Sequence, residues 1–200
     1  MRISPRCPFA LLLALALAAC AEGPEQILAP QMESNVLEQA QGGAQQSISF
    51  VRHGEDRASL SRHSVSFWGV RGETRTATLG YADGTPMVTL TIPQDALGRD
   101  AHGREVARGD SIQITMTLLD RKTFAVRFEP AGLRFNDQAP AILSFNLTRA
   151  ARKALASGSV SMWKQETPDS EWTLVPSVVD PSTRTLTANI DGFTVYALSY

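Results

Sequence analysis

The sequence predicts an all-β domain over residues 64–200, built as an antiparallel sandwich or a barrel of about nine or ten short strands. Three observations carry this prediction. Runs of alternating or β-branched apolar residues recur at close spacing, Gly, Pro and Asp turn signals separate them, and helix-forming stretches are almost absent. No repeat of fixed period and no internal linker interrupts the pattern, so we expect one domain.

The clearest predicted strand covers residues 111–119, where every second side chain is apolar and most of those between are Gln or Thr. A period of two predicts a strand that buries one face and exposes the other. Residues 123–128 predict the next strand, with three side chains directed inward: Phe124, Val126 and Phe128.

Residues 74–81 and 87–92 predict a β-hairpin, because both segments alternate and Asp83-Gly84 supplies a strong turn between them. A longer polar connection is expected over residues 93–108. The only good helix-forming stretch is 150–156, which Gly158 should end. The remaining predicted strands are 64–70, 133–135, 141–147, 160–164, 171–175, 183–190 and 193–198.

Residues 1–19 have the organisation of a secretory signal peptide. Arg2 and Arg6 precede an apolar run over residues 9–18, and small residues follow it. The run is much shorter than the roughly 20 apolar residues that span a bilayer as a helix, so we do not expect it to be a transmembrane anchor.

Leu17-Ala18-Ala19-Cys20 resembles the lipobox of bacterial lipoproteins. The resemblance implies cleavage before Cys20 and a diacylglyceride joined to its sulfur, which would anchor the protein in the bacterial cell envelope. The next residue is Ala21 and not aspartate, which by the same resemblance favours the outer membrane. The alternative is an ordinary secreted protein cut near Ala19, with Cys20 as a free thiol. Cys7 lies within the signal, so neither interpretation allows an intramolecular disulfide in the mature chain.

Beyond the signal, the sequence predicts three segments. Residues 20–46 are rich in Gln and Glu and lack aromatic residues, which indicates a flexible tether. Residues 47–63 form a connecting segment, with a short strand or docking segment at 47–51 and a charged loop at 53–63. The β-sandwich domain then covers residues 64–200.

The composition is that of an ordinary globular protein. The 200 residues carry a formal net charge of −1, with 43% hydrophobic and 20% charged residues. Loss of Arg2 and Arg6 with the signal would make the mature chain more acidic. This balance argues against a nucleic-acid partner, and the sequence leaves the oligomeric state undetermined.

The carboxyl-terminal part of the chain, from residue 87, resembles ZU5-like domains. The most specific match is the corner formed by Phe128-Glu129-Pro130-Ala131-Gly132-Leu133-Arg134-Phe135 and Ala139-Pro140-Ala141. More generic matches are residues 88–93 with Ala96-Leu97, residues 109–115, Trp163 and Trp172, and residues 191–196. The resemblance covers residues 87–200 and implies an immunoglobulin-like sandwich used mainly for protein contacts.

Some ZU5 domains cleave themselves at a His-Phe-Ser triplet in the closing strand. The matching residues are Gly192, Phe193 and Thr194, so the histidine is absent. A hydroxyl without a neighbouring base is a weak nucleophile. The resemblance therefore argues against self-cleavage, with Phe193 expected in the core and Thr194 facing outward.

The sequence contains no evident catalytic, cofactor-binding or metal-binding constellation. It has no nucleophile elbow and no phosphate-binding glycine loop. The three histidines, His53, His63 and His102, stand apart in the sequence, at no spacing typical of metal ligands. The nearest approach to a cluster of possible ligands is residues 53–56. Three aspartates in or beside one loop offer oxygen ligands for calcium, although solvated carboxylates are the simpler interpretation: Asp95, Asp100 and Asp110.

Two surface features remain open. The first is a short basic run, Arg149, Arg152 and Lys153, for which two interpretations stand: contact with an anionic glycan or lipid headgroup, or contact with solvent alone. The second is a set of aromatic side chains, Phe67, Trp68, Trp163 and Trp172. Its two interpretations are a carbohydrate-stacking surface, or packing in the core and at sheet edges.

These observations predict a lipid-anchored envelope protein with no enzymatic activity and no cofactor. Its domain would bind a protein or glycan partner or support the envelope. One alternative is a hydrolase acting on envelope or extracellular polymers, which a concave pocket with two converging carboxylates would favour. Another is a chaperone-like lipoprotein with an exposed apolar groove.

Overall fold

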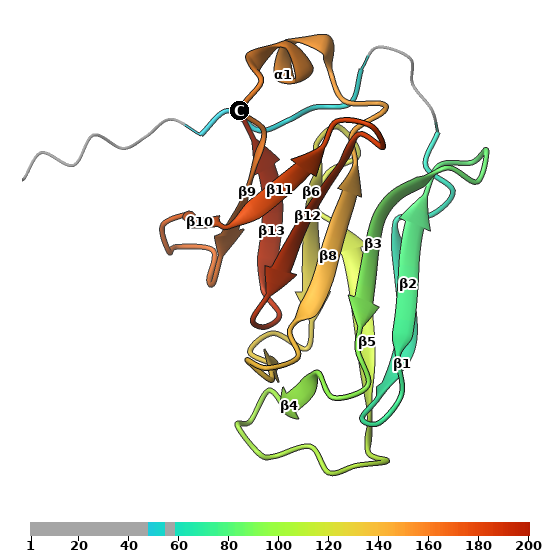
Figure 1. Ribbon diagram of the computed structural model, residues 1–200, viewed down its shortest axis with the longest axis vertical. Coiled ribbons are helices and arrows are strands. Elements are labelled where there is room, and N and C mark those ends of the chain that lie inside the picture. Colours follow the sequence, from blue (N-terminus) through green and yellow to red (C-terminus); the bar gives the residue numbers. More distant parts are fainter. Residues whose placement is uncertain (1–47, 55–58) are drawn as a thin grey trace, which may run out of the picture. The chain divides into compact units, whose positions relative to one another are not determined.

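The computed structural model describes residues 48–54 and 59–200. The predicted signal peptide, the predicted tether and Cys20 lie outside the described residues. The described part is nearly all β and contains thirteen strands and one short helix, which confirms the predicted fold class (Figure 1). This described helix is far too short to cross a membrane.

Two larger antiparallel sheets share one core. The strand order in the first is β1 (Ser64–Val70), β5 (Ser111–Leu118), β6 (Ala125–Glu129), β13 (Val195–Ser199), β9 (Ser161–Gln165) and β10 (Thr173–Val175). In the second it is β11 (Ser177–Asp180), β12 (Thr185–Ile190), β8 (Ala141–Asn146), β3 (Pro86–Ile92) and β2 (Arg75–Gly80). A third, two-stranded sheet pairs β4 (Leu97–Arg99) with β7 (Arg134–Phe135). Strands β4 and β11 are the two for which the sequence predicts no segment.

Alternation places the core where the sequence predicts it. On β5 the inward side chains Ile114, Met116 and Leu118 are buried, and the Thr residues between them are partly exposed. Phe124, Val126 and Phe128 are fully buried, as predicted. These side chains meet buried residues of the second sheet in one cluster, among them Leu90, Leu143, Phe145 and Leu186.

The predicted hairpin is confirmed. Strands β2 and β3 pair antiparallel, with Ala77 opposite Leu90 and Leu79 opposite Val88. Asp83 accepts a hydrogen bond from the Thr85 amide at 3.0 Å, which stabilises the turn. The predicted helix is also present as α1 (Arg152–Ser157), and Gly158 ends it in the left-handed conformation at φ 68°.

Residues 48–54, expected as part of a connection, pack into the domain. Val51 is fully buried. Its amide donates to the Leu198 carbonyl at 2.8 Å, and its carbonyl accepts from the Phe124 amide at 3.1 Å. An apolar side chain thus fills the end of the core between β13 and β6. The domain therefore includes chain that precedes residue 64.

The prediction for Thr194 is wrong. Phe193 is buried as expected, but Thr194 is also buried, and its hydroxyl donates to the Gln165 carbonyl. The Thr194 carbonyl in turn accepts from the Phe128 amide at 3.0 Å. The residue lies just before β13, where the neighbouring strands β6 and β9 both supply backbone partners. The hydroxyl is therefore committed to a structural hydrogen bond.

Gly192 is required by close backbone packing. A β-carbon at this position would lie 2.5 Å from the Leu133 carbonyl oxygen. Its own carbonyl accepts from the buried Tyr196 hydroxyl at 2.7 Å, so the backbone has little freedom to move. Gly192→Ala should therefore lower the free energy of unfolding by about 1–3 kcal/mol.

Urea denaturation of the Gly192→Ala variant measures this change. Gly54→Ala is the matched control, because a β-carbon there would lie 3.6 Å from the nearest atom, the Arg149 carbonyl oxygen. The control should change the free energy of unfolding by no more than about 0.5 kcal/mol. Equal urea midpoints for the two variants would show that Gly192 is not tightly enclosed.

Candidate functional site

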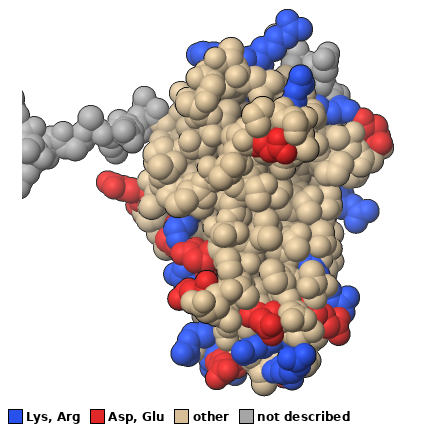
Figure 2. Space-filling model, in the orientation of Figure 1, with Lys and Arg blue, Asp and Glu red and all other residues tan. Residues whose placement is uncertain are grey.

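Charged side chains gather away from the broad face of the second sheet. Figure 2 shows this face as largely uncharged, with Lys, Arg, Asp and Glu around its margins and at both ends. The face carries a row of small hydroxyl side chains that are register partners across β2, β3, β8 and β12: Thr78, Thr89, Ser144 and Thr187. Sites that act through charge are therefore expected at the ends of the domain.

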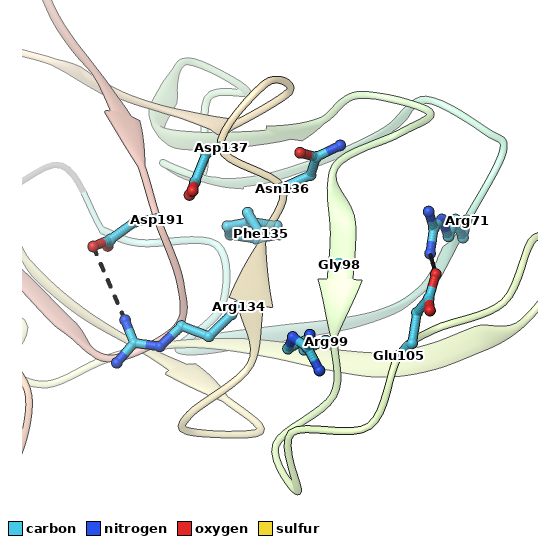
Figure 3. A pocket seen from close by; sticks show the side chains of 9 residues that line it. All are labelled: Arg71, Gly98, Arg99, Glu105, Arg134, Phe135, Asn136, Asp137 and Asp191. Carbon is cyan, nitrogen blue, oxygen red and sulfur yellow. Dashed lines mark hydrogen bonds and ion pairs between the residues drawn. The ribbon is translucent and has the colours of Figure 1, made fainter.

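A polar cleft of about 680 Å³ lies at the end of the domain that carries β4 and β7 (Figures 1 and 3). Strands β4 and β7 and the residues that follow β7 supply most of its lining: Gly98, Arg99, Arg134, Phe135, Asn136 and Asp137. Other parts of the chain contribute Arg71, Glu105 and Asp191. Three arginines and three carboxylates thus share one concave surface.

The small sheet of β4 and β7 holds the floor of the cleft in place. Leu97 and Phe135 are register partners, and both are buried, so this ribbon is fixed to the core. A β-carbon on Gly98 would lie 3.3 Å from backbone atoms of residues 134–136, so a larger side chain there would press on β7. Burial of the apolar partners leaves Arg99 and Arg134 exposed on the cleft side (Figure 3).

An ion-pair network forms one side of the cleft. Lys164 lies 2.8 Å from Asp191 and 3.0 Å from Glu166. Arg134 approaches the same two carboxylates at 3.9 Å and 3.8 Å. Burial raises the pKa of Asp191, but the hydrogen bond and charge of Lys164, a backbone hydrogen bond and the charge of Arg134 together outweigh it and hold the pKa below its ordinary value. Burial lowers the pKa of Lys164, and its bonds to the two carboxylates reverse this, so its pKa is raised. Both groups therefore stay charged at neutral pH.

The opposite side is held by Arg71. Its guanidinium donates to the Val106 carbonyl and lies 3.3 Å from the Glu105 carboxylate. Arg71 is thereby committed to the loop that follows β4. Arg99 is less engaged, because it donates only to the Gly103 carbonyl, at 3.0 Å.

Arg99 and Asp137 are the groups most available to a ligand. Neither makes an ion pair within residues 48–54 and 59–200, and both are exposed. The Asn136 amide next to them is held by the Asp95 carbonyl at 3.3 Å and by the Gln138 amide at 3.1 Å. The cleft therefore presents a free cation and a free carboxylate on fixed backbone.

Two carboxylates of the cleft, Asp137 and Asp191, lie on the same side of Phe135 (Figure 3). A glycosidase of the usual kind needs one carboxyl group whose pKa is raised so that it can donate a proton. The pKa of Asp191 is lowered instead. Asp191 therefore does not have the raised pKa that such a proton donor needs.

Two of the three aspartates considered for calcium, Asp100 and Asp110, serve their own loop. Asp100 accepts from the amides of His102 and Arg104 at 2.8 Å and 2.9 Å, and Asp110 accepts from the Ala107 amide at 2.9 Å. Within the residues that the structure describes, no group of three potential metal ligands comes together.

The aromatic side chains do not gather on one surface. Trp68 is 55% exposed on β1, while Trp172 lies next to β10, at the opposite edge of the same sheet. Trp172 packs edge-on against Phe50, with ring centroids 5.1 Å apart. A stacking platform made of all four aromatic residues is therefore excluded.

His102 lies in the loop after β4, whereas His53 and the basic run lie at the other end of the domain. His53 is partly buried and packs edge-on against Tyr81, and the two acidic residues that follow Gly54 lie outside the described residues. The basic run 149–153 lines a separate cavity there.

Sequence reasoning missed the cleft itself. Its residues come from distant parts of the chain, and only the corner at 128–135 drew notice. No known protein-family model matches the chain, and no curated protein sequence matches it. Function is therefore inferred from the site alone.

Proposed function

We propose that the protein is a lipid-anchored protein of the bacterial cell envelope whose ZU5-like β-sandwich binds a glycan in the cleft and catalyses no reaction. The lipobox at residues 17–20 supports the anchor on Cys20, and Ala21 supports an outer-membrane location. The corner that resembles ZU5 domains contributes two lining residues of the cleft, Arg134 and Phe135.

The observation that carries the glycan proposal is the balanced charge of the cleft. Arg and Asp side chains placed together offer donors and acceptors that match neighbouring sugar hydroxyls. Arg99 and Asp137 are free to do so, whereas the Lys164–Asp191 network keeps its shape. A strongly acidic ligand would meet the three carboxylates of the lining.

Loss of either free group should weaken glycan binding by about tenfold or more, because a hydrogen bond to a charged group contributes about 1.5–3 kcal/mol. The variants are Asp137→Asn and Arg99→Gln. Their matched controls are Asp169→Asn and Arg127→Gln, which remove exposed charges outside the cleft. Calorimetric titration of the full chain in detergent with soluble peptidoglycan glycan strands and chito-oligosaccharides measures the affinities.

The proposal predicts saturable binding that the cleft variants weaken and the controls leave unchanged. Equal binding by cleft variants and controls would contradict it, as would no binding of either probe. A protein partner is the second candidate, because the edge strands β10 and β11 expose Leu174 (54%) and Val178 (74%). This candidate would be favoured by two results together. Neither glycan binds, and the wild-type protein captures one envelope protein that the Val178→Lys variant does not.

A further inference from the structure

A cavity of about 920 Å³ lies at the end of the domain that carries α1, away from β4 and the polar cleft (Figure 1). Among the described residues, five cationic side chains and no acidic ones line it: Arg52, Arg149, Arg152, Lys153 and Arg184. The proposed glycan cleft, by contrast, has as many carboxylates as arginines. Cationic side chains that line the same cavity repel one another, and an anionic ligand would offset this repulsion.

Backbone hydrogen bonds hold the three segments of this basic cavity together. The Gly54 amide donates to the Arg149 carbonyl at 2.8 Å, and the Ala151 amide donates to the Arg52 carbonyl at 2.8 Å. The Leu147 amide donates to the Arg184 carbonyl at 2.7 Å. The cations are therefore carried on fixed backbone contributed by three parts of the chain.

Arg184 occupies an unfavourable backbone conformation. It lies in the turn between β11 and β12 with φ 51°, the one non-glycine residue among those described with positive φ. Gly or Asn is the usual residue at such a position, because a side chain crowds the backbone there. An arginine at this point strains the turn yet adds a charge to the cavity.

His53 is also among the residues that line the cavity. The Nε2 atom of His53 is buried and has no hydrogen-bond partner among the described residues. Its Nδ1 atom lies 3.1 Å from the Tyr81 hydroxyl, and with Tyr81 as the donor Nε2 carries the ring proton. Burial lowers the pKa of His53, and Asp120 opposes this only in part, so the ring is neutral at neutral pH.

Among the described acidic residues near the cavity, Asp83 offsets the charge of Arg149 alone. Asp83 pairs with Arg149, which also lies over the Tyr81 ring, and these contacts hold one guanidinium in place. Asp180 is in the same turn as Arg184, but its carboxylate accepts from the Ser182 amide at 2.8 Å and is outside the cavity lining.

We propose that the basic cavity is a binding site for a phosphate group, held by the guanidinium groups of Arg52, Arg152 and Arg184. Four of its five cations are arginines, whose planar forks match phosphate oxygens with two hydrogen bonds each. The site is independent of the glycan cleft and does not require the lipid anchor. Its phosphate comes either from an anionic lipid headgroup or from a soluble phosphate ester.

The decisive variant is Arg184→Asn, because asparagine tolerates positive φ and should leave the fold at least as stable. Loss of one charge-assisted contact should weaken phosphate binding by about 10- to 100-fold. Arg152→Gln should do the same without relieving strain. Arg127→Gln, on the outer side of β6 and outside the cavity, changes the net charge equally and should leave binding unchanged.

The first experiment is a calorimetric titration of the full chain in detergent with inorganic pyrophosphate. The second is flotation of the protein with phosphatidylcholine vesicles that contain or lack phosphatidylglycerol. Cys20→Ser protein is used for the vesicles so that a lipid anchor cannot bind them. If Arg184→Asn weakens the binding of pyrophosphate, the phosphate comes from a soluble ester. If Arg184→Asn weakens only the binding to vesicles with phosphatidylglycerol, the phosphate comes from a lipid headgroup. Thermal unfolding at or above the wild-type temperature verifies the folding of Arg184→Asn. Binding of neither probe, or equal weakening by Arg127→Gln, would overturn the proposal.

Discussion

Replacing Phe128 by alanine should lower the free energy of unfolding by about 3–5 kcal/mol, which is a large part of the total stability of an ordinary domain. Phe128 is fully buried between the sheets. Its ring stacks on Phe193 with centroids 5.1 Å apart and meets Tyr196 edge-on at 5.9 Å. Removal of the ring leaves a cavity beside Phe193 and Tyr196 that cannot collapse freely.

Urea unfolding followed by circular dichroism measures the loss. Phe128→Leu serves as the matched control, because it keeps most of the apolar volume and should cost clearly less. A Phe128→Ala variant with the urea midpoint of wild type would mean that this side chain lies outside the core.

Cys20→Ser should move the protein almost completely from the membrane fraction to the aqueous fraction. Each buried CH₂ of an attached lipid contributes about 0.8 kcal/mol, and two or three acyl chains together make an effectively permanent anchor. Serine lacks the sulfur that forms the thioether. The measurement is detergent phase partitioning of protein expressed with its leader in a bacterial host.

The second cysteine supplies a matched control for this prediction. Cys7 lies in the predicted signal, before the lipobox, so Cys7→Ser should partition like wild type. If Cys20→Ser stays in the detergent phase, or if Cys7→Ser leaves it, the proposed attachment site is refuted.

The strands that follow a clear period were predictable because burial decides which face they present. Strand β5 alternates over its whole length, and the buried side chains are the predicted ones. The hairpin of β2 and β3 was predictable because a strong turn joins neighbouring segments. Local chemistry was sufficient in both cases.

Thr194 shows where this reasoning fails. Simple alternation places it outward, yet both neighbouring strands offer backbone partners just before β13. The segment 48–54 shows the same limitation, because Val51 is buried by contacts with Leu198 and Phe124, far along the chain. Tertiary hydrogen bonds decide these positions, and no local pattern records them.

The two candidate sites could be predicted only in part. The basic run at 149–153 was visible, but Arg52 and Arg184 join it only through the fold. Likewise Arg99 and Asp137 line one cleft because the short strands β4 and β7 pair. A strand of two or three residues is too short to show a period, so its partner cannot be found from the sequence.

Intact mass spectrometry of the wild-type chain, recovered from bacterial membranes, tests the central claim of a lipid-anchored envelope protein most directly. The account predicts a polypeptide that begins at Cys20 and carries the added mass of a diacylglyceride, with or without a further acyl chain. A full-length precursor from the cytosol, or a processed chain with an unmodified Cys20, would contradict it.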